Sequence, residues 1–113
     1  MLFRSEAQAL NMARELCSYN RPVVILGQSY KSNVANNDGS YALLVGHYVK
    51  KLSGTVHYHD PLNNIEYVGY EPVTYLISYH HNWLWDYEFI PDSIVVDPWR
   101  QNLKISNCTV VNL

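Results

Sequence analysis

The chain has 113 residues, of which 48% are hydrophobic, and this size and composition suit one compact domain covering residues 1–113. The net charge is −2 and the lysines and arginines are spread along the sequence, so a nucleic-acid partner is not expected. No apolar run approaches the roughly 18 residues that cross a bilayer, and the first residues lack the layout of a secretory signal. We therefore expect no membrane partner, and a location in the cytoplasm or export by a route without a recognisable signal peptide.

The first quarter of the chain has the pattern of an amphipathic helix followed by a buried strand. Ser5 and Gln8 form a capping box, and the apolar residues that follow recur at intervals of three and four, which predicts a helix over residues 6–17. The unbroken apolar run of residues 22–27 is typical of a strand buried on both faces. We expect this strand at the centre of a sheet and the helix packed against it. The asparagine-rich residues 28–39 are predicted to form a loop.

The next segment is interpreted as a β-hairpin. Residues 40–51 are predicted to form its first strand, residues 52–54 its turn, and residues 55–61 its second strand. This hairpin brings a histidine-rich strand next to Asp60, which ends the second strand.

The remaining segments complete a sheet in this interpretation. Residues 65–68 are predicted to be extended and residues 73–80 to form a short helix. Residues 83–89 partly alternate apolar and polar side chains, as a half-buried strand does, and residues 93–98 and 108–111 resemble closing strands. The expected fold class is α+β, with the N-terminal helix packed on a mostly antiparallel sheet.

From residue 5 to about residue 89, the order of these segments resembles the later part of papain-like cysteine peptidases related to bacteriocin leader-processing enzymes. In that group a helix precedes a strand written Pro-Val-Ile-Val, here residues 22–25, and a later strand closes in Asp-Pro, here Asp60-Pro61. No helix corresponding to the one that carries the catalytic cysteine precedes these segments. The resemblance therefore implies papain-like topology in the later half of a truncated or degenerate domain.

The resemblance also implies positions for a catalytic base and its orienting carboxylate. An imidazole at the start of one strand would accept the thiol proton, and Asp60 on the next strand would fix its tautomer. Spacing favours the alignment that puts Tyr41 at the base position, where a phenol with a pKa of about 10 is a poor base. A second alignment retains His47. The candidate nucleophile is Cys17, although its place near the end of a helix is more typical of a buried thiol.

A metal site is a separate hypothesis that arises from the histidines of the second hairpin strand. His57 and His59 are two residues apart, so both project from one face of a strand, and zinc accepts imidazole ligands. No third ligand is fixed by spacing, and solvent-facing histidines are the favoured interpretation. We therefore predict no metal and no cofactor, and retain His57 and His59 as weak candidates.

The sequence leaves several functions open. The favoured one is a non-catalytic or degenerate papain-like domain that acts as a binding or regulatory module for a peptide or protein, including a second copy of the chain as a homo-oligomer. The first alternative is an active thiol hydrolase, namely a cysteine peptidase, amidase or deamidase, using Cys17, His47 and Asp60. The histidine-based metal site is the second alternative. The aromatic residues between 83 and 89 suit either a core or a binding face.

Overall fold

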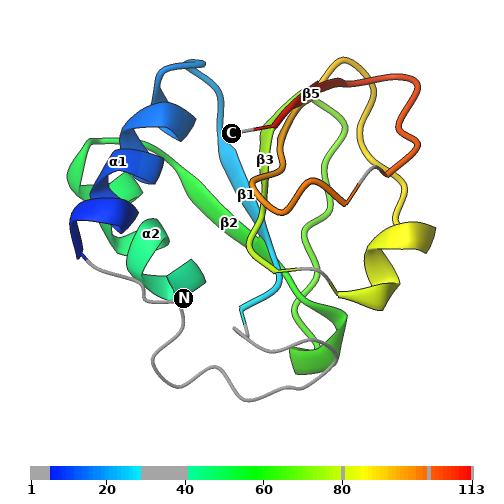
Figure 1. Cartoon of the computed structure of the whole chain (residues 1–113), viewed down its shortest axis with the longest axis horizontal. Helices are drawn as coiled ribbons and strands as arrows, with labels where there is room; N and C mark the ends of the chain where they lie inside the picture. Colours follow the sequence, from blue (N-terminus) through cyan, green and yellow to red (C-terminus); the bar gives the residue numbers. More distant parts are fainter. Residues whose placement is uncertain (1–5, 29–40, 80, 102, 113) are drawn as a thin grey trace.

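The computed structural model describes residues 6–28, 41–79, 81–101 and 103–112, and these form an α/β domain built on one sheet (Figure 1). Five strands form this sheet in the order β2-β1-β3-β4-β5. Their bounds are β1 Val23–Leu26, β2 Val56–His59, β3 Thr74–Ile77, β4 Ile94–Val96 and β5 Thr109–Val111. The helices are α1 Glu6–Cys17 and α2 Tyr41–Lys51, and two short 3-10 helices are η1 Pro61–Asn63 and η2 Asn82–Asp86.

Every strand pairing in the described part of the chain is parallel, so the prediction of an α+β fold with a mostly antiparallel sheet is wrong. All residues of β1 and β3 are buried. Strands of parallel sheets are buried on both faces, and their sequences are therefore nearly continuous apolar runs. Consecutive parallel strands need long crossover connections, and the helix α2 supplies the one between β1 and β2.

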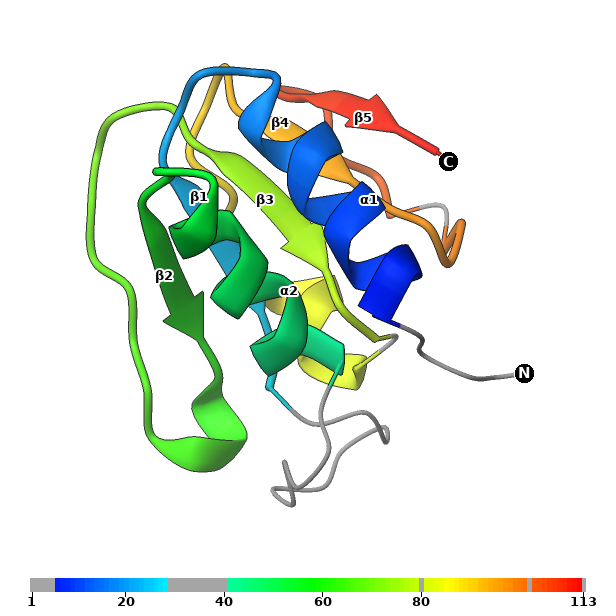
Figure 2. The same ribbon diagram turned by 90° about the vertical axis from the view of Figure 1, so that its left-hand side faces the viewer.

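Each face of the sheet has its own hydrophobic core. Figure 2 shows α1 and α2 side by side over one face, where Ile25 and Leu76 of the sheet pack against Ala13 and Val45 of the helices. The opposite face is covered by the segment that contains η2 and by the chain between β4 and β5, with Tyr75, Leu84 and Phe89 in its core.

The first strand of the expected hairpin is in fact helix α2. Its buried residues are Ala42, Val45, Gly46 and Val49, which recur at intervals of three and four and so lie on one face of a helix. The expected turn at residues 52–54 therefore joins a helix to β2, and β2 pairs with β1 in parallel.

Two further elements differ from the prediction. Residues 74–77 form β3 and no helix, because this apolar run is buried between β1 and β4. The expected strand over residues 83–89 begins as η2, in which Leu84 is buried while Trp85 is 57% exposed. The predicted helix over residues 6–17, the central strand β1 and the closing strands β4 and β5 are confirmed.

Parts of the sequence interpretation lie outside the described residues. These are Ser5 of the capping box and almost all of the asparagine-rich loop. Within the described ranges, neither α1 nor α2 is long and apolar enough to cross a membrane.

Candidate ligand-binding site

The carboxyl ends of the five parallel strands meet along one edge of the sheet, and the chain changes direction there. From β1 the chain continues to β2 on one side, whereas β3 and the later strands lie on the other side. Open parallel α/β sheets bind ligands beside the carboxyl ends of their strands, at such a change of direction. Buried polar residues follow four of the strands at this edge, namely Gln28, Asp60, Ser78 and Asp97.

Asp60 fastens the ends of β1 and β2 together. Its side chain is only 1% exposed, and Oδ2 accepts hydrogen bonds from the Gln28 backbone nitrogen at 2.9 Å and from Asn63 Nδ2 at 2.7 Å. Oδ1 accepts from the Leu62 backbone nitrogen at 3.1 Å and so caps η1. Because both carboxylate oxygens already have donors within the protein, Asp60 is a structural residue of this edge.

Ser78 closes the gap between the ends of β1 and β3. Its hydroxyl lies 2.9 Å from the Leu26 carbonyl oxygen and 2.8 Å from the Gly27 carbonyl oxygen, and its single proton is shared between them. Gly27 has a φ of 92°, and the fully buried ring of His81 packs against its α-carbon. This packing leaves no space for a ligand between β1 and β3 on the η2 side.

The turn after β4 holds Trp99 in a defined orientation. Asp97 accepts hydrogen bonds from the Trp99 backbone nitrogen at 3.0 Å and the Gln101 backbone nitrogen at 2.9 Å. The indole Nε1 donates to the Ser78 carbonyl oxygen at 3.0 Å, and the indole ring lies edge-on to Tyr79 at 4.8 Å between ring centroids. The indole is therefore oriented by contacts that need no ligand.

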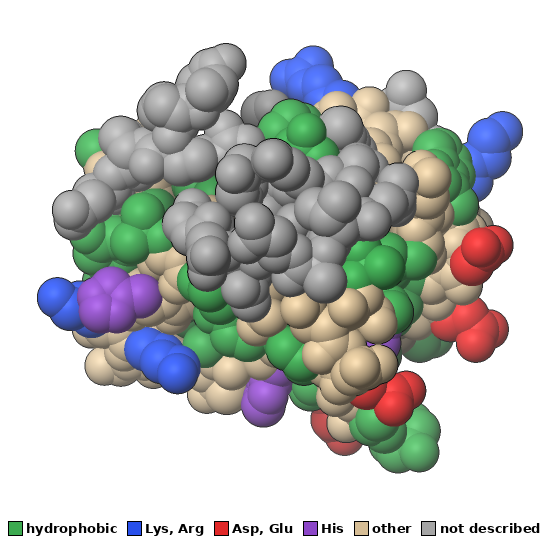
Figure 3. All heavy atoms as spheres, turned by 90° about the horizontal axis from the view of Figure 1, so that it is seen from below, with side chains coloured by type: hydrophobic (Ala, Val, Ile, Leu, Met, Phe, Trp, Pro, Cys, Tyr) green, Lys and Arg blue, Asp and Glu red, His purple; other side chains and the backbone are tan. Residues whose placement is uncertain are grey.

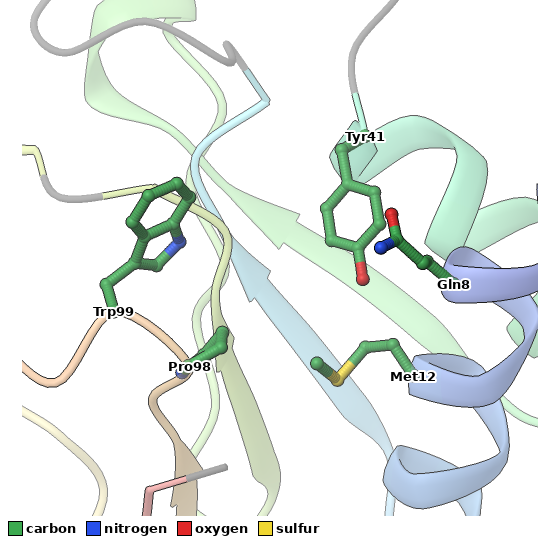
Figure 4. A pocket seen from close by; sticks show the side chains of 5 residues that line it. All are labelled: Gln8, Met12, Tyr41, Pro98 and Trp99. Carbon is green, nitrogen blue, oxygen red and sulfur yellow. The ribbon is translucent and has the colours of Figure 1, made fainter. Parts of the chain in front are cut away.

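A pocket of about 310 Å³ opens beside Trp99 on the helical side of the sheet (Figure 4). Trp99 and Pro98 form one wall. The opposite wall is formed by Tyr41 at the start of α2 and by Gln8 and Met12 in the first two turns of α1. Both helices begin at this edge, so the positive ends of their dipoles point toward it. The pocket thus offers aromatic surface for a flat ring, an amide for hydrogen bonding and a favourable field for an anion.

The structure does not bring Cys17, His47 and Asp60 together. Cys17 ends α1 and packs beside Gly54, just before β2 begins, whereas Asp60 follows the carboxyl end of β2. The whole of β2 lies between them, and its four residues extend over about 13 Å at about 3.3 Å per residue. Burial raises the pKa of the Cys17 thiol, which disfavours the reactive thiolate. His47 is exposed on α2, with its ring edge-on to Tyr48.

Tyr41, which the sequence placed at the base position, instead lines the pocket beside Trp99. The aromatic ring of Tyr41 is therefore a candidate for stacking against a flat ligand, and it is no longer a candidate for proton transfer. Trp99 and Met12 were not singled out from the sequence, and Gln8 was considered only as part of a capping box. The sequence repeats an Asp-Pro step at Asp60 and Asp97, and this repeat could have indicated the edge, because both steps follow parallel strands there.

His57 and His59 project from the same face of β2 but pack against aromatic rings. The His57 ring lies 4.9 Å from that of Tyr67, and the His59 ring lies 4.8 Å from that of Tyr87 and 5.6 Å from that of Trp83. His59 Nδ1 accepts a hydrogen bond from the Tyr67 backbone nitrogen at 3.1 Å. Among the described residues, no group of three or more His, Cys, Asp or Glu side chains is placed to hold a metal ion.

The stability of the fold is expected to depend on the protonation of His59. Burial lowers its pKa below the ordinary 6.5, and this outweighs the opposite effect of Glu66 and Asp60. The unfolded chain then binds the proton more readily than the folded one. Neutral His59 therefore contributes its full share of the folding stability above pH 6.5, and this share is lost as the pH falls through the folded-state pKa. We expect the urea midpoint to fall on acidification from about pH 7.5 to about pH 5, and to fall less in His59→Gln. An equal fall in both proteins would contradict this.

Comparisons with known proteins identify the fold. Neither the protein-family models nor the curated proteins include a match to this sequence. Among solved structures, a UDP-D-ManNAc dehydrogenase from Pyrococcus horikoshii matches with a TM-score of 0.66 and 14% sequence identity over 94% of this chain. The chain spans 30% of the length of that protein.

The resemblance to papain-like cysteine peptidases is therefore wrong, and the peptidase and hydrolase functions lose the fold on which they rested. The segments that suggested it do occur in the expected order, but α2 replaces the strand that would carry the base, and the sheet is parallel throughout its described strands. At 14% identity the similarity to the dehydrogenase concerns the fold alone, and that fold is a Rossmann-like α/β arrangement.

Proposed function

We propose that this domain binds a nucleotide, namely the uridine diphosphate part of a nucleotide sugar, in the pocket between Trp99 and Tyr41. The observation that carries the proposal is the aromatic pocket at the carboxyl edge of the sheet, where both helices begin. The choice of uridine diphosphate comes from the name of the dehydrogenase that shares the fold. The dehydrogenase reaction is not part of the proposal, because the chain spans 30% of that protein.

The size and chemistry of the pocket suit the pyrimidine ring of the ligand, but the pocket is too small for a whole nucleotide sugar. Its volume of about 310 Å³ is at the lower end for ligand pockets, which run from about 300 to 1,000 Å³. A pyrimidine ring would stack on the indole of Trp99, which is already oriented by its hydrogen bond to Ser78. Among the described residues that line the pocket none is acidic, and the positive ends of the helix dipoles favour a diphosphate there.

The test is isothermal titration calorimetry with UDP-D-ManNAc, UDP and uridine. Trp99→Ala is expected to weaken UDP binding by about tenfold or more, because stacking of a base on an aromatic side chain contributes about 1–3 kcal/mol. Trp85→Ala is the matched control, since Trp85 is 57% exposed and lies outside this pocket. Thermal melts of both variants check that the fold is intact.

Three outcomes would decide the proposal. Binding of UDP that is lost in Trp99→Ala and kept in Trp85→Ala supports it. Equal weakening in the two tryptophan variants would contradict it, as would the absence of binding of all three ligands to the unsubstituted protein. Uridine is expected to bind more weakly than UDP, because it lacks the phosphates that the helix ends attract.

A further inference from the structure

A second surface of the molecule carries acidic and aromatic side chains together, on the sheet face opposite α1 and α2. Two adjoining hollows of about 350 Å³ and 730 Å³ share Tyr87, Glu88 and Ile90 as lining residues. We call this surface the η2 face and define it by Glu66, Tyr67, Trp85, Asp86, Tyr87 and Glu88. It is separate from the proposed nucleotide pocket, with which it shares no lining residue.

The charge of the η2 face is negative. Glu66, Asp86 and Glu88 line the smaller hollow and all three are exposed, and its lining in the described part of the chain includes no lysine or arginine. The larger hollow has Lys104 among its lining residues as well as Glu88. In Figure 3 the acidic side chains lie on the right and lower right, and lysine or arginine side chains appear on the left, at the top and at the upper right. A nucleotide phosphate would be repelled by this face, and a cation would be attracted.

Aromatic rings in this face are held rigidly from below. The Tyr87 ring is edge-on to Phe89 at 4.9 Å and to Tyr75 at 5.8 Å, and its hydroxyl hydrogen-bonds to that of Tyr75 at 3.3 Å. Burial raises the pKa of Tyr87, so its phenol stays neutral and the negative charge of the hollow comes from the carboxylates. A rigid neutral ring beside carboxylates is the arrangement that binds a guanidinium or ammonium group.

Large apolar side chains are exposed next to these hollows. Trp85 is 57% exposed, Val68 69% and Tyr70 90%. Exposed tryptophan and tyrosine close to pockets are the residues that most often dominate the energy of protein–protein binding. These apolar side chains and the carboxylates together suit a partner segment in which basic and apolar side chains alternate.

We propose that the η2 face binds a basic, extended peptide segment of a partner protein. An arginine or lysine of that segment enters the smaller hollow, between the tyrosine rings and the carboxylates of Glu66, Asp86 and Glu88. A neighbouring apolar side chain packs in the larger hollow beside Trp85. The choice of a cationic occupant rests on charge complementarity, since the described residues that line the smaller hollow include three carboxylates and no lysine or arginine.

Fluorescence anisotropy with two labelled short peptides tests this proposal. One peptide alternates arginine and leucine, and its matched control alternates glutamate and leucine. The arginine peptide is expected to bind about tenfold more tightly or better. Glu88→Gln should weaken it about fivefold, because Glu88 lines both hollows, and Trp85→Ala should weaken it by a similar factor. Neither variant should change UDP binding in calorimetry.

Glu71→Gln is the matched control variant, because Glu71 is exposed and lines neither hollow. Equal weakening by Glu71→Gln and Glu88→Gln would show attraction by net charge alone and would overturn the proposal. Equal binding of the two peptides would also overturn it. Sedimentation equilibrium provides a third check. If the protein self-associates and Glu88→Gln abolishes this self-association, the proposal is also overturned, because the occupant of the η2 face would be a second copy of this chain.

Discussion

Replacing Asp60 by alanine is expected to lower the free energy of unfolding by about 3–4 kcal/mol. The carboxylate is 1% exposed and accepts from Gln28, Leu62 and Asn63, so its removal leaves the buried Gln28 nitrogen and two part-buried donors without an acceptor. Asp60→Asn keeps one acceptor oxygen but places an amide opposite another donor, and should cost about 2 kcal/mol. Urea denaturation followed by circular dichroism measures both differences.

Asp97→Ala is the matched control for this prediction. Asp97 is also 1% exposed and also precedes a proline, but it accepts from two backbone nitrogens that belong to its own turn, Trp99 and Gln101. Its loss should therefore destabilise the protein less than the loss of Asp60, which joins two strands. A smaller effect of Asp60→Ala than of Asp97→Ala would show that the link between β1 and β2 is not what Asp60 contributes.

Local pattern was sufficient where one segment decides its own structure. The spacing of apolar residues predicted α1 with the observed bounds, and the unbroken run after Pro22 predicted a central buried strand. The strands β4 and β5 were found in the same way. α1 has the spacing of an amphipathic helix, and the three strands are short runs rich in valine and isoleucine, which favour a strand over a helix.

Local pattern was not sufficient for α2 and β3. The run that forms α2 contains leucine, valine and tyrosine, which fit either a strand or a helix, and its buried positions at Ala42, Val45 and Val49 have helical spacing. Interpreting it as a strand made the next strand antiparallel by necessity, since a short turn joins only antiparallel strands. One wrong element thus changed the fold class and led to a resemblance that the sheet contradicts.

The candidate site depends on topology more than on any motif. Gln8, Tyr41 and Trp99 come from the starts of two helices and from the turn after β4, and only the parallel order of the strands brings them to one edge. Asp60 was singled out as a catalytic carboxylate, and it lies at this edge as a structural one. Buried aspartates indicate where strands end, because their carboxylates accept hydrogen bonds from the backbone of the following turn whether or not a ligand is bound.

Gly27→Ala is expected to lower the free energy of unfolding by about 3 kcal/mol, from two independent causes. Gly27 has a φ of 92°, a conformation that side chains with a Cβ rarely adopt. A Cβ at this position would also lie 2.8 Å from two ring atoms of His81, and that ring is fully buried and cannot move aside. The measurement is the urea midpoint of the variant against that of the unsubstituted protein.

A double-mutant cycle with His81→Ala separates the two causes. Removing the His81 ring eliminates the overlap but leaves the backbone strain at Gly27, so the alanine at position 27 should cost about half as much in the His81→Ala background. If alanine at position 27 costs nothing in the His81→Ala background, the steric contact with the His81 ring is the whole reason that glycine is required here. An unchanged cost would mean that the ring of His81 does not constrain position 27, and that the packing between β1 and η2 is looser than the 2.8 Å approach implies.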